Sequence, residues 1–389
     1  TMPGFELIGK KEQTAVNDVF EKSGGVLFAH GFDARRNNIF RVRDFETKFA
    51  QKLQGRRAAA CTSGTAAQYI AMKSLGITAG DEVITQSFTF IATIEAIMAC
   101  GAKPIIVDIN ETYNMSPQSL EAAITEKTKL IIPVHMLGNL AEMDEINKIA
   151  KRYKIPVLED ACEALGATYK GKSAGLLSDV GVFSLDFGKT ITTGEGGMII
   201  SNNEDLISKC FKFIDHGHDS DLSLPRGQDT AVAYGFNYRM MELQAAVGLV
   251  QIDRLSHIVE SNRRHKKIIK DELSAFSDKI KFRKITDEGE LADTIIFNLE
   301  SSKLSDKLVI KLGEEGLGTK NVPDAMRWHF TKYFTQIWEN TNYYQNNSTA
   351  WSISDKLLSR SVSLPIMVNW TESDLNRITN SLKKILSSI

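Results

Sequence analysis

The stretch VGVFSLDFGKTITTGEGGMIIS, from Val180 to Ser201, joins two short apolar runs through a loop that contains one lysine, Lys189. Both runs are rich in apolar residues and too short for a typical helix, which is the pattern of buried strands. The glycines that close the loop indicate a turn into the second run. The stretch therefore predicts a strand, a loop that carries Lys189, and a second strand.

Short apolar runs of this kind recur over residues 55–200. Further apolar runs lie at residues 81–88, 103–109, 129–135 and 155–161, and helical patterns lie at residues 65–76, 89–101 and 139–154. Continuous apolar strands that alternate with amphipathic helices are typical of a mostly parallel sheet covered on both faces. The sequence therefore predicts an α/β domain.

The pattern changes near residue 240. Residues 240–276 read as one long helix or two in series, and they are followed by a strand near 293–300, a helix near 305–316 and a closing helix at 371–389. We predict a large domain over residues 1–250, including the N-terminal segment, and a smaller C-terminal α/β domain over residues 251–389.

Composition narrows the class of protein. The formal net charge of -1 gives no reason to expect a nucleic acid or a membrane surface as partner. No apolar run approaches the roughly 20 residues that span a bilayer, and the N-terminus lacks the apolar core of a signal peptide. The cysteines Cys61, Cys100, Cys162 and Cys210 are widely spaced, without a zinc-site pattern. We expect a reduced, cytoplasmic protein without a metal.

Three motifs could carry chemistry. In CTSGTAAQYIAM a small polar turn with Gly64 and Thr65 opens a helix, whose N-terminus can bind a phosphate or can simply be capped. In VLEDACEALG, Asp160 follows an apolar run, so it lies where ligands bind in open α/β sheets. It could pair with a protonated ring nitrogen, or cap the next helix. Lys189 could form a Schiff base with a carbonyl cofactor, or lie in an exposed loop.

The order and spacing of these motifs resemble the fold-type I pyridoxal-phosphate enzymes and, more narrowly, the DegT/DnrJ/EryC1/StrS family of sugar aminotransferases. The resemblance covers nearly the whole chain and rests on SGTAA, GDEVITQSFTFIAT, LEDACEALG, FSLDFGKTITTGEGG and GFNYRMMELQAAVG. It implies a large, mostly parallel sheet domain, a smaller C-terminal domain and pyridoxal 5'-phosphate as cofactor.

The resemblance also implies roles for single residues. Lys189 matches the Schiff-base lysine, which also shuttles a proton, and Asp160 matches the partner of the pyridinium nitrogen. Phe88 matches the aromatic that stacks on the cofactor ring. The positions that match the phosphate cradle are Gly64, Thr65 and Ser184. Asn237 matches a residue that reaches the phosphate from a neighbouring subunit, which implies a homodimer.

Glu163 departs from the family, which commonly has glutamine near the phenolic oxygen of the cofactor. A carboxylate there would repel a phenolate unless it is protonated or turned away. Some family members carry histidine in place of the lysine and catalyse deoxygenation, whereas this chain keeps Lys189, which favours amino transfer.

The resemblance implies L-glutamate as amino donor and a carbonyl sugar as acceptor, for bacterial surface polysaccharide such as lipopolysaccharide. Short stretches such as PGFEL, RDFE and HGHD are most similar to family members that aminate an oxidised 3-deoxy-octulosonate, so we expect that acceptor ahead of a nucleotide-linked keto-sugar. A dehydratase or lyase, or a cofactor-binding regulatory protein on the same fold, stays open. Candidate substrate contacts are Arg35, Arg226, His216, His218 and Arg327.

Overall fold

The computed structural model describes residues 3–31, 34–219, 224, 226–340 and 350–389. Its central element is a sheet with the strand order β1-β9-β8-β5-β4-β2-β3. The first four strands form one hydrogen-bonded group and the last three form another. Isolated parallel bridges join the two groups, one between Ile131 and Val157 and one between Val134 and Asp160. The strands are β1 (Arg57–Cys61), β2 (Glu82–Gln86), β3 (Lys103–Val107), β4 (Thr128–Ile132), β5 (Leu158–Asp160), β8 (Val180–Ser184) and β9 (Gly197–Ser201). Only β9 runs against its neighbours, so the prediction of a mostly parallel sheet is confirmed.

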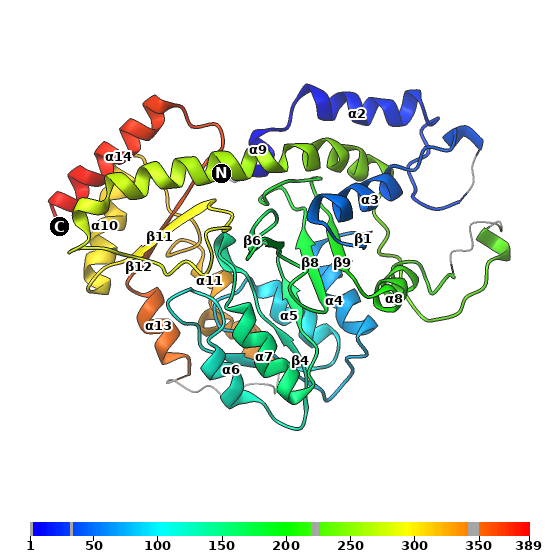
Figure 1. Ribbon diagram of the computed structural model, residues 1–389, viewed down its shortest axis with the longest axis horizontal. Helices are drawn as coiled ribbons and strands as arrows, with labels where there is room; N and C mark the ends of the chain where they lie inside the picture. The colour runs from blue at the N-terminus through cyan, green and yellow to red at the C-terminus, as the bar shows by residue number, and fades with distance from the viewer. Residues whose placement is uncertain (1–2, 32–33, 220–223, 225, 341–349) are drawn as a thin grey trace.

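Helices cover both faces of this sheet (Figure 1). One face packs under α4 (Gly64–Ser74), α5 (Ile91–Ala99) and α8 (Glu204–Ile214), and the other under α3 (Arg41–Leu53), α6 (Pro117–Ala123) and α7 (Met143–Tyr153). Side chains of β4 alternate between these layers, with Ile131 in one apolar cluster and Leu130 and Ile132 in the other. Because both faces are buried, the strands read as continuous apolar runs.

The C-terminal part is built around a smaller antiparallel sheet of β10 (Lys281–Phe282), β11 (Thr294–Asn298) and β12 (Ser361–Pro365). Helices α10 (Ser302–Glu314) and α14 (Glu372–Ser387) cover it and share its apolar cluster. The single helix α9 (Glu242–Glu272) runs from α3 to this sheet (Figure 1). The predicted boundary between residues 250 and 251 falls inside α9, and the division into two domains stays a prediction.

Apart from the twelve-residue helix α2 (Lys10–Glu21), the remaining elements are short. They are α1 (Pro3–Glu6), η1 (Ala34–Arg36), η2 (Met136–Gly138), β6 (Thr168–Tyr169), β7 (Lys172–Ser173), η3 (Arg226–Gln228), η4 (Ser274–Phe276), α11 (Met326–His329), η5 (Thr331–Tyr333), α12 (Thr335–Asn340) and α13 (Ser352–Leu358). The segment that carries α11 and α13 returns to the large sheet, because Val322, Phe330 and Trp351 share an apolar cluster with Phe88 and Tyr113.

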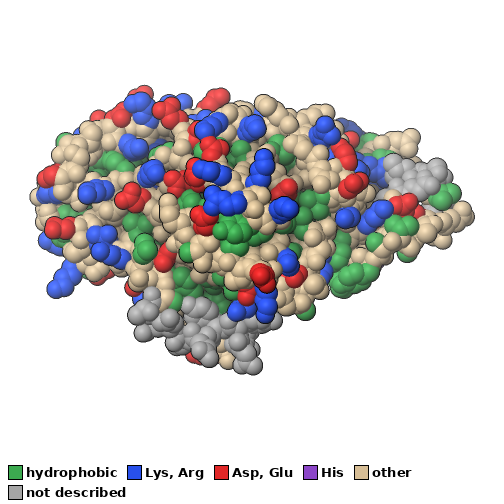
Figure 2. Space-filling model, turned by 60° about the horizontal axis from the view of Figure 1, so that its bottom comes forward, with side chains coloured by type: hydrophobic (Ala, Val, Ile, Leu, Met, Phe, Trp, Pro, Cys, Tyr) green, Lys and Arg blue, Asp and Glu red, His purple; other side chains and the backbone are tan. Residues whose placement is uncertain are grey.

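Among the described residues, no helix combines the length and the apolar character needed to cross a bilayer. Lys and Arg side chains alternate with Asp and Glu over the face shown in Figure 2.

Gly197 lets β9 pass directly under the N-terminus of α4. A Cβ atom at this position would lie 2.1 Å from the carbonyl oxygen of Ser63, which caps α4. We expect Gly197→Ala to lower the free energy of unfolding by about 1–3 kcal/mol, because the backbone of Ser63 must move. Urea denaturation measures this, with Gly318→Ala as the matched control, since a Cβ atom there meets nothing within 4 Å. Equal effects of the two substitutions would contradict the explanation.

Candidate functional site

The ends of β5 and β8 meet the N-terminus of α4. Asp160 ends β5, Ser184 ends β8 and Gly64 begins α4. A Cβ atom on Gly64 would lie 2.7 Å from Cβ of Ser184 and 3.2 Å from Sγ of Cys162. Only glycine allows this approach, which brings the backbone N–H groups of a helix N-terminus to the end of the sheet.

Asp160 is buried and held by three donors. Its Oδ2 accepts hydrogen bonds from Nε2 of Gln68 at 2.9 Å and from Oγ1 of Thr93 at 2.8 Å, and its Oδ1 accepts one from the N–H of Cys162 at 3.2 Å. An ionised carboxylate only accepts hydrogen bonds, so the donors match that state. They fix the side chain at the carboxyl end of the strand, where it can receive a protonated ring nitrogen.

Lys189 lies in a loop that is pinned to the core. The N–H of Leu185 donates to the carbonyl of Gly196 at 2.8 Å, and the side chains of Leu185 and Ile191 are fully buried. These anchors explain how a loop lysine comes to have a side chain that is only 18% exposed. The alternative of an ordinary solvated lysine is therefore wrong.

Glu163 faces Lys189. Its Oε1 lies 3.6 Å from Nζ of Lys189, and its Oε2 accepts a hydrogen bond from the N–H of Leu137 at 3.0 Å. Burial alone would lower the pKa of the Lys189 ammonium, but the Glu163 carboxylate, assisted by Cys162 and Asp160, raises it. Burial would likewise raise the pKa of Glu163, but Lys189 and other cations lower it. The two groups thus form an ion pair, and the carboxylate is not turned away from the site.

Phe88 is fully buried and packs in an apolar cluster with Tyr113 and Phe330. The stacking role of Phe88 stays a prediction. Phe90, two residues later, is 41% exposed, and its ring centroid lies 5.3 Å from that of His329.

His329 joins the same group of residues. Its Nε2 lies 4.0 Å from Oε1 of Glu163, and its Nδ1 lies 2.9 Å from the carbonyl of Ala325. Burial lowers its pKa, although Glu163 acts in the opposite direction. Arg327, one of the candidate substrate contacts, is exposed on the same short helix α11. Residues two positions apart on a helix point in different directions.

Other predicted residues lie outside this group. Thr65 is exposed in the first turn of α4, and Asn237 is exposed on a segment that pairs with Asp215. His218 Nδ1 lies 3.3 Å from Oδ2 of Asp229, and His216 is exposed beside it. Arg35 is exposed in η1 and Arg226 begins η3, while the side chain of Arg226 lies outside the described residues.

The basic stretch around residue 36 is mostly structural. Arg36 is 1% exposed and pairs with Glu242 at 3.3 Å, and the guanidinium of Arg41 donates to the carbonyl of Asp18 at 2.8 Å. Among the described residues, no group of three or more His, Cys, Asp or Glu side chains is arranged to hold a metal ion.

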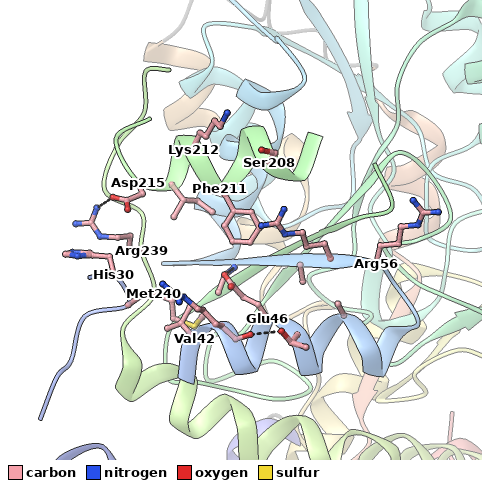
Figure 3. Close-up of a pocket in the computed structure, with 18 of the residues that line it drawn as sticks. His30, Val42, Glu46, Arg56, Ser208, Phe211, Lys212, Asp215, Arg239 and Met240 are labelled. Atoms are coloured by element: carbon pink, nitrogen blue, oxygen red, sulfur yellow. Dashed lines mark hydrogen bonds and ion pairs between the residues drawn. The ribbon is translucent and has the colours of Figure 1, made fainter. Parts of the chain in front are cut away.

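A cavity of about 590 Å³ lies elsewhere, between α3, β1 and α8 (Figure 3). None of the residues that were predicted to bind the cofactor lines it. Its wall carries Arg43, Arg57 and Arg239 around Glu46, and burial raises the pKa of Glu46 to about 8. The candidate site is therefore defined by Lys189, Asp160 and Glu163 and not by this cavity.

Comparison with known proteins identifies the family of the chain. A family model described as the DegT/DnrJ/EryC1/StrS aminotransferase family matches residues 37–383. The GDP-perosamine synthase of Caulobacter vibrioides is 43% identical over 222 residues, which are 57% of this chain and 58% of that protein, less than two thirds of its length. The GDP-perosamine synthase of Vibrio cholerae is 30% identical over 347 residues, 89% of this chain and 90% of that one.

Solved structures give the same result. The aminotransferase from Psychrobacter cryohalolentis has a TM-score of 0.89 at 26% identity, with both chains fully covered. NtdA from Bacillus subtilis, solved with bound PMP, has a TM-score of 0.83 at 27% identity over 98% of this chain and 83% of that one. The predicted fold class is confirmed, and the chain belongs to the DegT/DnrJ/EryC1/StrS aminotransferase family.

Proposed function

We propose that the protein is a pyridoxal-phosphate-dependent sugar aminotransferase. The observation that carries the proposal is the meeting of Lys189, Asp160 and Glu163 beside Gly64 at the carboxyl ends of β5 and β8. The PMP bound in NtdA, and PLP and PMP forms of a sugar aminotransferase of Streptococcus pneumoniae, support the cofactor.

The residues present fit this cofactor. Gly64 leaves the N-terminus of α4 free of a Cβ atom where a phosphate would bind, with Thr65 and Ser184 at its sides. The carboxylate of Asp160 would hold the proton on the ring nitrogen. Phe88 or Phe90 would cover the ring.

When bound, pyridoxal phosphate supplies an electrophilic carbon and a ring that delocalises an electron pair. Lys189 would hold the cofactor through its ε-amino group, and the same amino group would carry a proton to and from the substrate carbon. Glu163 keeps Lys189 charged while that lysine is not bound to the cofactor. His329 closes the site on the side of α11.

For the amino donor we propose L-glutamate. Two acceptor classes follow from different observations. Short stretches of sequence favour an oxidised 3-deoxy-octulosonate, as set out above. The names of the GDP-perosamine synthases favour a nucleotide-linked sugar. A regulatory role on the same fold has one observation in its favour, the 41% identity over 226 residues to a pleiotropic regulatory protein of Geobacillus stearothermophilus.

We also propose a homodimer. Exposed apolar side chains gather on the segment that carries Asn237 and on the chain beside it, where Phe28 pairs with Met241. The set comprises Phe28, Val232, Tyr234, Phe236 and Met241. Exposed apolar groups of this kind mark protein interfaces, and a second copy would bring Asn237 to the phosphate of its neighbour. The compartment we propose is the cytoplasm, in keeping with four free cysteines.

The proposal is tested on the purified protein. With added pyridoxal phosphate we expect a visible absorption that borohydride fixes to Lys189, and release of one 2-oxoglutarate per active site from glutamate. Aminated enzyme is then incubated with an octulosonate aldehyde and with a GDP-linked keto-sugar, and the aminated product identifies the acceptor. Cofactor binding without 2-oxoglutarate would favour the regulator, and no absorption would contradict the whole proposal.

Glu163→Gln is expected to move the pH titration of the Lys189-linked cofactor absorbance. The substitution removes the carboxylate that raises the pKa of Lys189, so a cation at this nitrogen loses its partner and deprotonates at lower pH. The measurement is the absorbance as a function of pH. Glu195→Gln is the control, because it removes an exposed carboxylate on the same loop. An unchanged titration in Glu163→Gln would show that the ion pair has no influence on the linked state.

A further inference from the structure

The turn formed by η2 (Met136–Gly138) contributes a backbone group to the site. Leu137 has φ 51 and ψ 45, which is the left-handed region, and its side chain is fully buried. Its N–H is the donor to Oε2 of Glu163 at 3.0 Å. A residue with a side chain pays about 1–2 kcal/mol for this conformation, so other contacts must hold the turn.

Arg283 supplies those contacts from the C-terminal part of the chain. It follows β10, its N–H donates to the carbonyl of Ile296 at 3.0 Å, and it is 3% exposed. Its Nη1 donates to the carbonyl of Met136 at 3.0 Å and its Nη2 to the carbonyl of Leu137. One guanidinium therefore holds both peptide groups that set the direction of the Leu137 N–H.

Arg283 is itself anchored. Its Nη2 lies 3.6 Å from Oε2 of Glu290, and the same oxygen accepts a hydrogen bond from Nζ of Lys266 on α9 at 2.7 Å. The next residue of the turn is also held, because the carbonyl of Gly138 accepts a hydrogen bond from the N–H of Leu291 at 2.9 Å. Residues 283–291 thus hold the turn together with Asn114, whose Oδ1 accepts a hydrogen bond from the N–H of Met136 at 2.9 Å.

We propose that Arg283 is a positioning residue for the Lys189 site, which it reaches through the Leu137 turn and Glu163. The proposal rests on the proposed function, in which Lys189 binds the cofactor. The guanidinium orients the Leu137 N–H, this N–H donates to Oε2 of Glu163 at 3.0 Å, and Oε1 of the same carboxylate lies 3.6 Å from Nζ of Lys189. The contact between the two parts of the chain thereby controls the protonation of the site.

The direction of the effect follows from the charges around Glu163. Among the described residues, its carboxylate faces the cationic or titratable groups Lys189, His329, Lys320 and Cys162, and it accepts a backbone hydrogen bond from Leu137. Loss of that donor destabilises the ionised carboxylate, which then protonates at higher pH. Less negative charge then remains beside Lys189. The Lys189 nitrogen that is bound to the cofactor therefore loses its proton at lower pH.

The first experiment uses the cofactor-bound protein with Arg283→Met, which keeps an unbranched apolar side chain and removes the guanidinium. We expect the pH titration of the visible absorbance to move toward lower pH. In a Glu163→Gln background the same substitution is expected to cause no further movement of the titration, because the carboxylate through which Arg283 acts has been removed. An equal movement in both backgrounds, or none in either, would overturn the proposal.

Arg263→Met is the matched control. Its guanidinium donates to the carbonyls of Gly289 and Glu290 at 2.8 and 2.9 Å, in the segment that holds the turn, but it does not contact the turn itself. If the titration moves as far in Arg263→Met as in Arg283→Met, the effect comes from a general loss of order in this segment. That result would count against the proposal.

A second readout does not need the cofactor. In the cofactor-free protein, hydrogen exchange of the peptide that contains Leu137 is expected to be about threefold to tenfold faster in Arg283→Met than in Arg263→Met, as the loss of one or two hydrogen bonds implies. Unchanged exchange would overturn the proposal. If the unsubstituted protein forms no linked absorption at all, the proposed function fails, and the exchange result still decides whether Arg283 holds the turn.

Discussion

Lys189→Ala is expected to abolish the visible absorption of the cofactor-bound protein and to lower amino transfer by about 10²–10⁴-fold or more. The ε-amino group is the only nucleophile that the loop presents beside Asp160 and Glu163, and alanine leaves neither a nucleophile nor a proton carrier. Spectroscopy with added pyridoxal phosphate and the rate of 2-oxoglutarate release measure the two losses.

The substitution also leaves Glu163 without its nearest cation, which lies 3.6 Å away. Because the pKa of Glu163 is lowered in the folded protein, the pair contributes stability above the ordinary pKa of a glutamate and loses it as the pH falls. Lys189→Ala should therefore lower the melting temperature near neutral pH and much less in acid. The double variant Lys189→Ala, Glu163→Gln separates this effect from catalysis, since it should regain stability without regaining turnover. Turnover that survives in either variant would remove Lys189 from the mechanism.

Asp160→Asn is expected to have the second largest effect, a loss of about 10²–10⁴-fold in amino transfer with the fold retained. An amide has nearly the same shape, but it carries no charge with which to keep a ring nitrogen protonated. One of its atoms also becomes a donor that faces the donors Gln68 and Thr93. The rate of the first half-reaction and the absorbance spectrum measure the loss.

The neighbouring carboxylate provides the control for Asp160. Glu159 is equally buried, but successive side chains of a strand point to opposite faces of the sheet. It accepts hydrogen bonds from the N–H groups of Gly175 and Leu177 and lies 3.1 Å from Nε2 of His135. Glu159→Gln should lower stability and leave the cofactor spectrum unchanged. A spectrum altered as much as in Asp160→Asn would mean that loss of any buried charge near β5 disturbs the site.

The positions of Lys189 and Asp160 could be predicted because they depend on local pattern. An apolar run of strand length ends at Asp160, and polar residues at the carboxyl end of a parallel strand face the ligand side of the sheet. The run before Lys189 and the glycines after it likewise define a loop between two strands. Family resemblance then added roles that the pattern alone left open.

The sequence pattern does not show which of the two aromatic residues after β2 is accessible. Phe88 and Phe90 are two positions apart, so both would lie on the same face of a strand. The alternation of side chains therefore cannot distinguish them. The chain leaves β2 at Gln86 and enters α5 at Ile91, and the turn between them buries Phe88 and exposes Phe90. The side chains that α11 directs toward the site could not be predicted for a similar reason, because this helix has only four residues and shows no periodicity.

By itself, the sequence determined the alternation of strands and helices, the place of Lys189 between β8 and β9, and the place of Asp160 at the end of β5. These features follow from hydrophobic periodicity and turn residues, which act over a few positions. Only the tertiary structure decided that Glu163 pairs with Lys189, and that Arg283 holds the Leu137 turn from 146 residues away. Such contacts form when separate elements pack together. The sequence around one partner therefore does not identify the other partner.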